Sequence, residues 1–303
     1  MVDGWDADQL GFEFSFLRIL KLFALKEMLE RYGNHPEEVK GMSTEKLRET
    51  FLIPDLFAGH DFNFTYSHYD RMIIGGVAPS GNAISLPNYT ALKAEYFLER
   101  REMGIINIGG EGVVTAGNET YALSKLDCLY LGKGVQEVSF ESKVADQPAK
   151  FYILSAPAHQ TYPNVLMKSS EATPAEMGAA ATSNQRIIYK YIHLDGIKSC
   201  QLVMGLTILK EGNVWNTMPP HTHNRRMEAY LYFDVQEGGV VFHFMGEAAQ
   251  TRHLLMSSGD AVISPPWSIH AGCGTASYSF IWGMAGENQA FTDMDGIDIK
   301  NLK

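Results

Sequence analysis

Alternating apolar and polar residues dominate the chain after residue 50. The segment DFNFTYSH, residues 61–68, has an apolar or aromatic side chain at every second position, which is typical of a half-buried β-strand. Similar runs recur at a spacing of roughly 8–12 residues and are separated by glycine turns, a pattern that favours an all-β sandwich or barrel. They cover residues 72–79, 94–117, 126–142, 150–159, 187–194, 200–209, 228–235, 239–246, 252–258, 260–265 and 278–286.

This strand pattern occurs twice, once on each side of a segment of different composition. Residues 161–186 hold two prolines, several serines and threonines and an alanine run, so we predict a linker with one short helix at residues 174–181. The chain of 303 residues is long enough for two cores of this size. We therefore expect a first barrel at residues 51–160 and a second at residues 187–303.

The N-terminal segment has a different periodicity. Residues 11–31 place Phe12, Phe16, Ile19 and Phe23 on one stripe of an amphipathic helix. Charged residues interrupt the apolar run, the start is acidic, and no clear cleavage site is present, so an amphipathic helix is a better interpretation than a secretory signal. We expect residues 1–50 to form a short helical extension with its lead-in to the first barrel.

The charge and the hydropathy of the chain argue against nucleic acid and membranes as partners. The formal net charge is -10 and the pI is about 5.5, which argues against nucleic acid because binding phosphates requires a basic face. No uncharged apolar run reaches the roughly 18 residues of a membrane span, so we expect no membrane partner. An odd, scattered set of cysteines without a CxxC pair indicates a reduced, cytoplasmic protein. These cysteines are Cys128, Cys200 and Cys273.

The stretch MPPHTHNRRMEAYLYF, residues 218–233, brings metal-ligand side chains together. His221 and His223 are two residues apart, so in an extended strand both imidazoles point to the same face. Glu228 has the wrong parity for that strand, so a turn at residues 224–226 must precede it. A hairpin of this kind directs two imidazoles and a carboxylate toward one point.

A third imidazole, that of His270, follows in the stretch GDAVISPPWSIHAG, residues 259–272. Three imidazoles and one carboxylate suit a divalent transition metal with an open position for substrate. The plainer alternative is a polar turn together with a core histidine. The presence of both motifs in order favours the metal, with zinc, manganese, iron and nickel all compatible.

Other polar residues are weaker candidates. Three arginines could bind a substrate carboxylate bidentately, although surface salt bridges are an equally good explanation. These are Arg225, Arg226 and Arg252. The catalytic residue is not identified by the sequence, and the weak candidates are Tyr230, His253 and Gln289. Strand histidines such as His243 are more often structural. The run from Glu99 to Glu102 is most simply a charged strand edge and turn.

These motifs resemble those of the cupin superfamily. HTHNRRME, residues 221–228, with Gly212 upstream is similar to the first cupin motif, and Gly259, Pro265 and His270 are similar to the second. Five longer segments together resemble the 5-keto-4-deoxyuronate isomerase family, and the resemblance spans residues 34–303. They are residues 66–76, 96–110, 148–163, 213–233 and 280–295.

The resemblance implies two cupin-type jelly-roll barrels, with one zinc ion in the second held by His221, His223, Glu228 and His270. The first barrel has no HxH motif and is expected to be metal-free. The implied enzyme is a ketol-isomerase of pectin and polyuronide degradation, and its assembly a homohexamer. The expected reaction converts the small uronate 5-dehydro-4-deoxy-D-glucuronate to 3-deoxy-D-glycero-2,5-hexodiulosonate. The first thirty or so residues lie outside the resemblance, as an upstream extension or a start at Met28 would explain.

Two other functions stay open at this point. An oxygen-using metal cupin such as a dioxygenase would need similar ligands, and iron dependence with oxygen consumption would distinguish it. A non-catalytic sugar-binding cupin is the other alternative. A sensor of that class usually carries a basic helix-turn-helix, and the chain shows no such segment.

Overall fold

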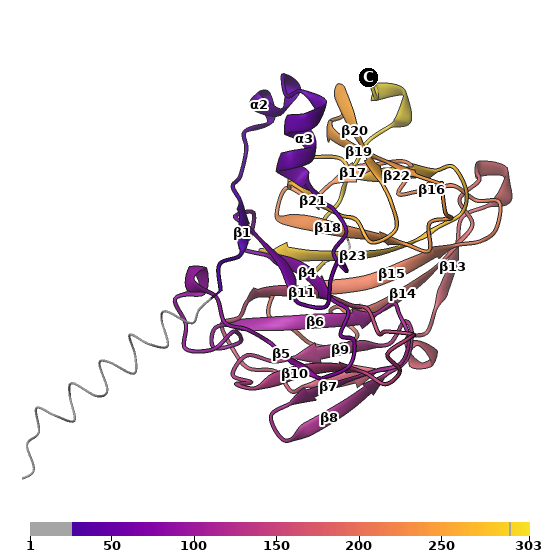
Figure 1. The fold of residues 1–303 in the computed structure, drawn as a ribbon. Coiled ribbons are helices and arrows are strands. Elements are labelled where there is room, and N and C mark those ends of the chain that lie inside the picture. The colour runs from indigo at the N-terminus through magenta and orange to yellow at the C-terminus, as the bar shows by residue number, and fades with distance from the viewer. Residues whose placement is uncertain (1–25, 291) are drawn as a thin grey trace, which may run out of the picture.

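Four β-sheets are stacked one above another in the computed structural model of the chain, which describes residues 26–290 and 292–303 (Figure 1). A four-stranded sheet packs on a seven-stranded sheet to form each barrel, and the two seven-stranded sheets face each other in the middle of the molecule. The all-β prediction with two jelly-roll barrels is thus confirmed.

The first barrel consists of two sheets with antiparallel pairing throughout, except where β1 joins β3 in parallel. Its large sheet has the order β1 (Leu29–Arg31), β3 (Asn63–Ser67), β4 (Ile73–Val77), β11 (Phe151–Pro157), β6 (Arg101–Asn107), β9 (Cys128–Leu131), β12 (Val165–Met167). Its small sheet has the order β5 (Ile84–Ser85), β10 (Val138–Ser142), β7 (Gly112–Ala116), β8 (Glu119–Leu123).

The second barrel repeats this arrangement. Its large sheet has the order β13 (Ala175–Met177), β14 (Arg186–Ile192), β15 (Val203–Leu209), β23 (Ser279–Gly286), β18 (Arg226–Phe233), β21 (Ala261–Ser264), β2 (Leu52–Ile53). Its small sheet has the order β16 (Trp215–Asn216), β22 (Ala271–Gly274), β19 (Val241–Glu247), β20 (Gln250–Met256). A two-stranded ribbon joins β17 (His221–Thr222) to β24 (Asp295–Gly296).

The central strands of the large sheets are covered on both faces. Every residue of β6 and of β18 is buried, because the small sheet of each barrel lies on one side and the opposite large sheet on the other. Glycines allow the two large sheets to approach closely. A Cβ atom at Gly104 would lie 2.7 Å from Met204 Sδ, and one at Gly283 would lie 2.0 Å from Leu154 Cδ1. Substituting either glycine would push the barrels apart.

The segment before the first barrel in sequence packs against the second barrel. β2 precedes the first barrel in sequence yet pairs with β21 of the second, in the position that β12 occupies beside β9 in the first. The helices α2 (Pro36–Lys40) and α3 (Thr44–Phe51) also lie against the second barrel, and α3 buries Leu47 and Phe51 there. Residues 36–53 therefore extend the second barrel, whereas we had expected a lead-in to the first.

Three local expectations differ from the structure. The helix predicted at residues 11–31 lies largely outside the described residues, and its last residues form β1. The helix predicted at residues 174–181 is wrong, since β13 pairs there with β14 and only a 3₁₀ turn, Ala180–Thr182, follows. The 161–186 segment also contributes the edge strands β12 and β13. Its remaining polar character reflects surface exposure at those edges. The other 3₁₀ turns are Thr90–Leu92, Ser169–Glu171 and Ile299–Asn301.

The third difference concerns the run from Glu99 to Glu102. Arg101 is 6% exposed and Glu102 is 0% exposed, so these two residues are buried in β6 and do not form a charged edge. Arg101 donates to the carbonyl oxygens of Arg71 and Ser155. Burial of such groups is affordable only with partners of this kind.

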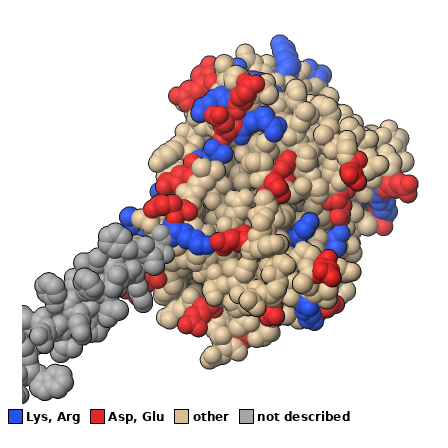
Figure 2. Space-filling model, in the orientation of Figure 1, with Lys and Arg blue, Asp and Glu red and all other residues tan. Residues whose placement is uncertain are grey.

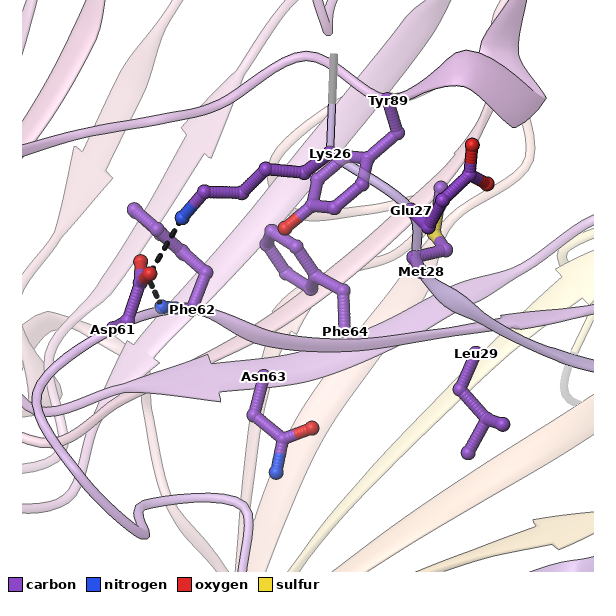
Figure 3. A pocket seen from close by; sticks show the side chains of 9 residues that line it. All are labelled: Lys26, Glu27, Met28, Leu29, Asp61, Phe62, Asn63, Phe64 and Tyr89. Carbon is purple, nitrogen blue, oxygen red and sulfur yellow. Dashed lines mark hydrogen bonds and ion pairs between the residues drawn. The ribbon is translucent and has the colours of Figure 1, made fainter. Parts of the chain in front are cut away.

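The surface is mixed in charge. On the face in Figure 2, acidic and basic side chains are interspersed, without a continuous basic area. No helix in the described part of the chain is long and apolar enough to span a bilayer. A cavity of about 430 Å³ opens on the first barrel beside residues 26–29, where Lys26 reaches Asp61 and the Tyr89 ring forms one wall (Figure 3). The histidines predicted as metal ligands do not line it.

Candidate metal centre

The histidine and glutamate side chains of the HTHNRRME motif converge inside the second barrel. His221 lies on β17, and His223 follows it at the turn into β18, where the backbone N–H of Arg226 donates to the His223 carbonyl oxygen. Glu228 comes from β18, and His270 directly precedes β22. β17 pairs with β24 and β18 lies inside the large sheet between β23 and β21, so the two strands do not form the hairpin that we expect from the sequence. The β17 ribbon, an inner strand of the large sheet and the start of a strand of the small sheet bring the four side chains to one place.

The four ligand atoms form a closed ring. His221 Nε2 lies 3.0 Å from His223 Nε2 and 3.0 Å from His270 Nε2. Glu228 Oε2 lies 2.9 Å from His270 Nε2 and 3.3 Å from His223 Nε2. For metal–ligand bonds of about 2.1 Å, neighbouring ligands are about 3.0 Å apart at right angles and about 3.4 Å apart in a tetrahedron. The distances thus fit four ligands close to right angles around one ion.

The chemistry of these groups also fits a cation. Glu228 Oε2 is buried and has no hydrogen-bond partner among the described residues, and three imidazole nitrogens face it. A buried carboxylate oxygen without a partner is costly unless a cation neutralises it. The three imidazoles and the carboxylate direct their lone pairs at one point. Nitrogen and oxygen donors of this kind suit a divalent transition metal.

Electrostatics keep these groups in the forms that bind metal. Burial favours the neutral carboxyl of Glu228, but the imidazoles of His270 and His223 outweigh this effect and hold its pKa well below the usual range. Burial, reinforced by the neighbouring His270, lowers the pKa of His221 to about 3. A carboxylate and a neutral imidazole are therefore present near neutral pH, and metal binding requires both.

Two of the three ligand imidazoles, those of His223 and His270, have an oxygen within reach of Nδ1. With Nε2 on a metal, Nδ1 carries the proton, so His223 Nδ1 donates to the Asp293 carbonyl oxygen at 3.3 Å. His270 Nδ1 lies 3.4 Å from Ser264 Oγ. These contacts hold the imidazole planes in the orientation that directs Nε2 inward.

The barrel interior next to the ligands is polar. The Tyr230 hydroxyl lies 3.2 Å from Thr217 Oγ1, and the Tyr230 ring centroid is 5.6 Å from that of His270. The Tyr232 hydroxyl lies 2.8 Å from Nδ1 of the fully buried His243. The equivalent interior of the first barrel is an apolar cluster of residues such as Phe64, Ile73, Val77, Leu129 and Ile153. Of the two interiors, the second therefore has polar side chains at its centre and the first has apolar ones.

A family model matches the part of the chain that forms the two barrels. The model of the KduI/IolB family matches residues 57–299, which is most of both barrels. The chain belongs to the KduI/IolB family. Within that family, the 4-deoxy-L-threo-5-hexosulose-uronate ketol-isomerase of Shouchella clausii is 56% identical over 273 residues, covering 90% of this chain and 99% of that protein. The protein of the same name from Bacillus subtilis is 52% identical over 276 residues, covering 91% and 100%.

Solved structures show the same fold at low sequence identity. An IolB-like protein from Salmonella typhimurium superposes with a TM-score of 0.67 and 15% identity, covering 82% of this chain and 96% of that one. An oxalate decarboxylase from Lactobacillus farciminis gives a TM-score of 0.53 and 10% identity, covering 75% and 79%. The two-barrel cupin fold of this KduI/IolB family member is therefore shared by distant proteins.

The three weak catalytic candidates occupy different places in the KduI/IolB fold. Tyr230 shares the inward face of β18 with Glu228 and lies beside the ligands. His253 is exposed and pairs with Phe244, on the face of the small sheet opposite to His243. Gln289 donates to Ser199 Oγ and to the Leu202 carbonyl oxygen, at the junction of the barrels. The structure brings Tyr230 to the ligand cluster and leaves His253 outside the barrel.

The three arginine candidates also separate. Arg225 is exposed, and its Nε lies 3.8 Å from Glu287 Oε2. Arg226 is 1% exposed, and its Nη1 donates to Asn288 Oδ1 and to the Ala290 carbonyl oxygen. Arg252 donates to the carbonyl oxygens at the end of α2 and just beyond it, on Val39, Lys40 and Met42. Arg225 is therefore the one of the three with a guanidinium open to solvent beside the ligand turn.

Sequence reasoning missed several polar residues of the interior. Asn216 accepts from the Tyr278 hydroxyl and donates to Thr217 Oγ1, which continues to Tyr230. Asn216 and Thr217 precede the ligand motif in a short strand and turn, where polar residues are ordinary, so no sequence signal distinguished them. The sequence favours a structural role for His243, and the alternation of this residue with Val241 and Met245 indicates an inward-facing side chain.

Proposed function

We propose that this protein is a metal-dependent ketol-isomerase that converts 5-dehydro-4-deoxy-D-glucuronate to 3-deoxy-D-glycero-2,5-hexodiulosonate in the breakdown of pectin and related polyuronides. One observation carries the proposal: a ring of three imidazoles and one carboxylate lies in a polar barrel interior, in a chain 56% identical over 90% of its length to a protein named for this reaction. The ion is zinc, one per chain, held by His221, His223, Glu228 and His270.

The reaction is an isomerisation, so it needs no external oxidant or reductant. A carbonyl and a neighbouring hydroxyl exchange positions through an enediol, and one proton moves between adjacent carbons. A bound divalent ion supplies Lewis acidity that favours negative charge on the reacting oxygens. The remaining contributions come from side chains of this chain.

Tyr230 is the side chain that we place against the reacting oxygens. Burial and the nearby Glu228 carboxylate raise its pKa well above the ordinary value, so the phenol remains protonated and can donate a hydrogen bond. Thr217 fixes its orientation through their mutual contact at 3.2 Å. A preoriented donor in a dry site stabilises charge developing in the transition state.

Arg225 is the proposed anchor of the substrate carboxylate. It is exposed on the same turn as the ligands and is held only by a 3.8 Å contact with Glu287. A planar guanidinium binds a carboxylate bidentately, and such positioning lowers KM without changing the reacting groups. Arg225→Met is expected to raise KM for the uronate with little change in kcat.

The enzyme is placed in the cytoplasm and assembles as a homohexamer in this proposal. The reaction proposed for one chain depends neither on the location of the protein nor on its assembly. Light scattering coupled to size-exclusion chromatography tests the assembly, and a mass close to one or two chains would contradict it.

A proton NMR time course in D₂O with 5-keto-4-deoxyuronate and zinc-loaded protein tests the reaction. Conversion to the diketo acid establishes the isomerase, and deuterium at the migrating position shows exchange with solvent through the enediol. Unchanged substrate in the presence of confirmed bound zinc would rule out this function.

A further inference from the structure

A C-terminal segment lies along the turn that carries two of the four ligands. Residues 287–290 and 292–297, which we call the strap, pair through β24 with β17, so that Gly296 is opposite His221. The backbone N–H of Ile297 donates to the Pro220 carbonyl oxygen, and that of Glu287 donates to the Arg225 carbonyl oxygen. Both ends of the ligand turn are thus held by the strap.

Arg226 joins the middle of the strap to the site. Its guanidinium is buried, and Nη1 donates to the Ala290 carbonyl oxygen at 2.9 Å and to Asn288 Oδ1 at 3.1 Å. Nη2 lies 3.5 Å from the Asp293 carbonyl oxygen and 3.1 Å from His223 Nδ1. The planar guanidinium group therefore spans three strap positions and the back of a ligand imidazole.

The Asp293 carbonyl oxygen is shared by these two side chains. When Nε2 of His223 binds a metal, its Nδ1 proton needs an acceptor, and the Asp293 oxygen is 3.3 Å away. Arg226 Nη2 then has the same oxygen as its acceptor. An arginine that fixes this carbonyl fixes the plane of the imidazole.

The strap is also fastened to the junction of the barrels. Gln289 Nε2 donates to Ser199 Oγ and to the Leu202 carbonyl oxygen. The loop that holds Ser199 and Leu202 is itself bound by Glu102 of the first barrel, which accepts from the backbone N–H groups of residues 200, 201 and 202. Hydrogen bonds, linked by short stretches of backbone at residues 199–202 and 289–290, thus connect β6 of the first barrel to Arg226 and His223.

We propose that Arg226 is a positioning residue for the ligand His223, and that Gln289 anchors the strap on which Arg226 acts. This inference rests on the metal site of the proposed function. It attributes the geometry of the ring of ligands in part to contacts outside the ring, and it gives the first barrel a part in shaping a site that lies in the second.

A role for Arg226 in binding the substrate carboxylate is the competing assignment. Arg226 is 1% exposed, and its Nη1 and Nη2 contact Asn288, Ala290 and Asp293. Its Nε has no hydrogen-bond partner among the described residues, but it is buried as well. Arg225, the preceding residue, has the same charge and an exposed side chain, so it provides a matched control.

Cobalt binding tests the proposal independently of the reaction. Metal-free wild type, Arg226→Met, Arg226→Lys, Gln289→Leu and Arg225→Met are titrated with Co²⁺ against a chelator, and the visible absorption of each loaded protein is recorded. Removing a residue that orients a ligand typically weakens metal binding about 10–100-fold. We expect this loss and an altered Co²⁺ spectrum for Arg226→Met, a smaller loss in the same direction for Gln289→Leu and Arg226→Lys, and wild-type behaviour for Arg225→Met.

Wild-type affinity and spectrum in Arg226→Met would overturn the inference. If Arg226→Met does not fold, wild-type cobalt behaviour in both Arg226→Lys and Gln289→Leu overturns it instead. A wild-type protein that binds no Co²⁺ contradicts the metal site and the proposed function together. A wild type that binds Co²⁺, and zinc, but leaves the uronate unchanged contradicts the isomerase alone, and the positioning role of Arg226 stands.

Discussion

The carboxylate of Glu102 on β6 of the first barrel accepts a hydrogen bond of 2.8 Å from the backbone N–H of Leu202, just before β15 of the second. The same carboxylate accepts from the N–H groups of Cys200 and Gln201 and from the Tyr130 hydroxyl. A fully buried charge is thus compensated by four donors, three of which lie across the junction. Glu102 joins the barrels by a charge-assisted contact within an apolar interface.

Replacing Glu102 by glutamine is expected to destabilise the protein. Glutamine keeps one acceptor oxygen but directs N–H groups at the backbone donors of the 200–202 loop, which leaves buried donors unsatisfied. The expected loss is about 2 kcal/mol or more in the free energy of unfolding. Urea denaturation measures it, with Glu141→Gln on the exposed face of β10 as the control. Equal midpoints for the two variants would contradict this account.

Removing the metal is expected to abolish activity and to lower stability. A ligand that binds the native state at 1,000 times its dissociation constant contributes about 4 kcal/mol. Chelator-treated protein should therefore unfold at a lower temperature and recover both stability and turnover when zinc returns. Glu228→Gln, which replaces the anionic ligand, should not recover with zinc. Full activity of the chelated protein would exclude a metal-dependent reaction.

Tyr230→Phe is expected to lower kcat by about 10²–10³-fold, the cost of losing one preoriented hydrogen-bond donor. Its zinc content should stay at one per chain, because the tyrosine ring packs beside His270 without being a ligand. Steady-state kinetics and metal analysis on the same preparation check both points. Tyr189→Phe, on β14 of the same sheet, is the matched control. A kcat within a factor of two of wild type would remove Tyr230 from the reaction.

Acidification should destabilise the metal-free protein through His243. Burial, with a smaller contribution from His270, lowers the pKa of His243 to about 3, against an ordinary value of 6.5. Between these values the unfolded chain binds a proton that the folded chain does not, so the free energy of unfolding falls as pH falls. The slope is up to about 1.4 kcal/mol per pH unit for one such histidine. His243→Leu should show a shallower slope from pH 6.5 downward in chemical denaturation, and an unchanged slope would contradict the buried, neutral imidazole.

Arg252→Met is expected to loosen the N-terminal helices without altering KM. Its guanidinium binds the carbonyl oxygens of Val39, Lys40 and Met42, and losing such contacts costs about 1–3 kcal/mol. Limited proteolysis should cut this variant faster than wild type within residues 33–43. His253→Ala, its exposed neighbour on β20, serves as the comparison. A raised KM with normal proteolysis would instead support Arg252 as a substrate anchor.

Local patterns predicted the strands and the ligand types because each depends on residues close in sequence. The alternation at residues 61–68 reflects one buried face, and the His221–His223 spacing reflects strand geometry. Local patterns could not predict which side chains form hydrogen bonds with residues far away in the sequence. Arg226 and Arg252 look alike in sequence, and their different roles follow from carbonyl groups about 65 and 210 residues away, which no local rule identifies.

The same limit explains the wrong interpretation of Glu102 and of the 174–181 segment. A charged residue in a strand usually faces water, and Glu102 is buried because backbone donors 98–100 residues later surround it. The 174–181 residues have helix-compatible composition, but β14 offers them an open edge. In both places, contacts with residues that are not adjacent in sequence outweighed the local preference of the residues for a charged surface or for a helix.

The early strand β2 has a consequence for the order in which the protein is made. Residues 52–53 leave the ribosome long before β21, the strand with which they pair, at residues 261–264. Domains that are continuous in sequence can finish folding as soon as they emerge. The strands of the first barrel's two sheets are complete once residue 167 has been made, so this barrel can close early. The second barrel is completed only when β2 pairs with β21, which requires synthesis of the chain up to residue 264.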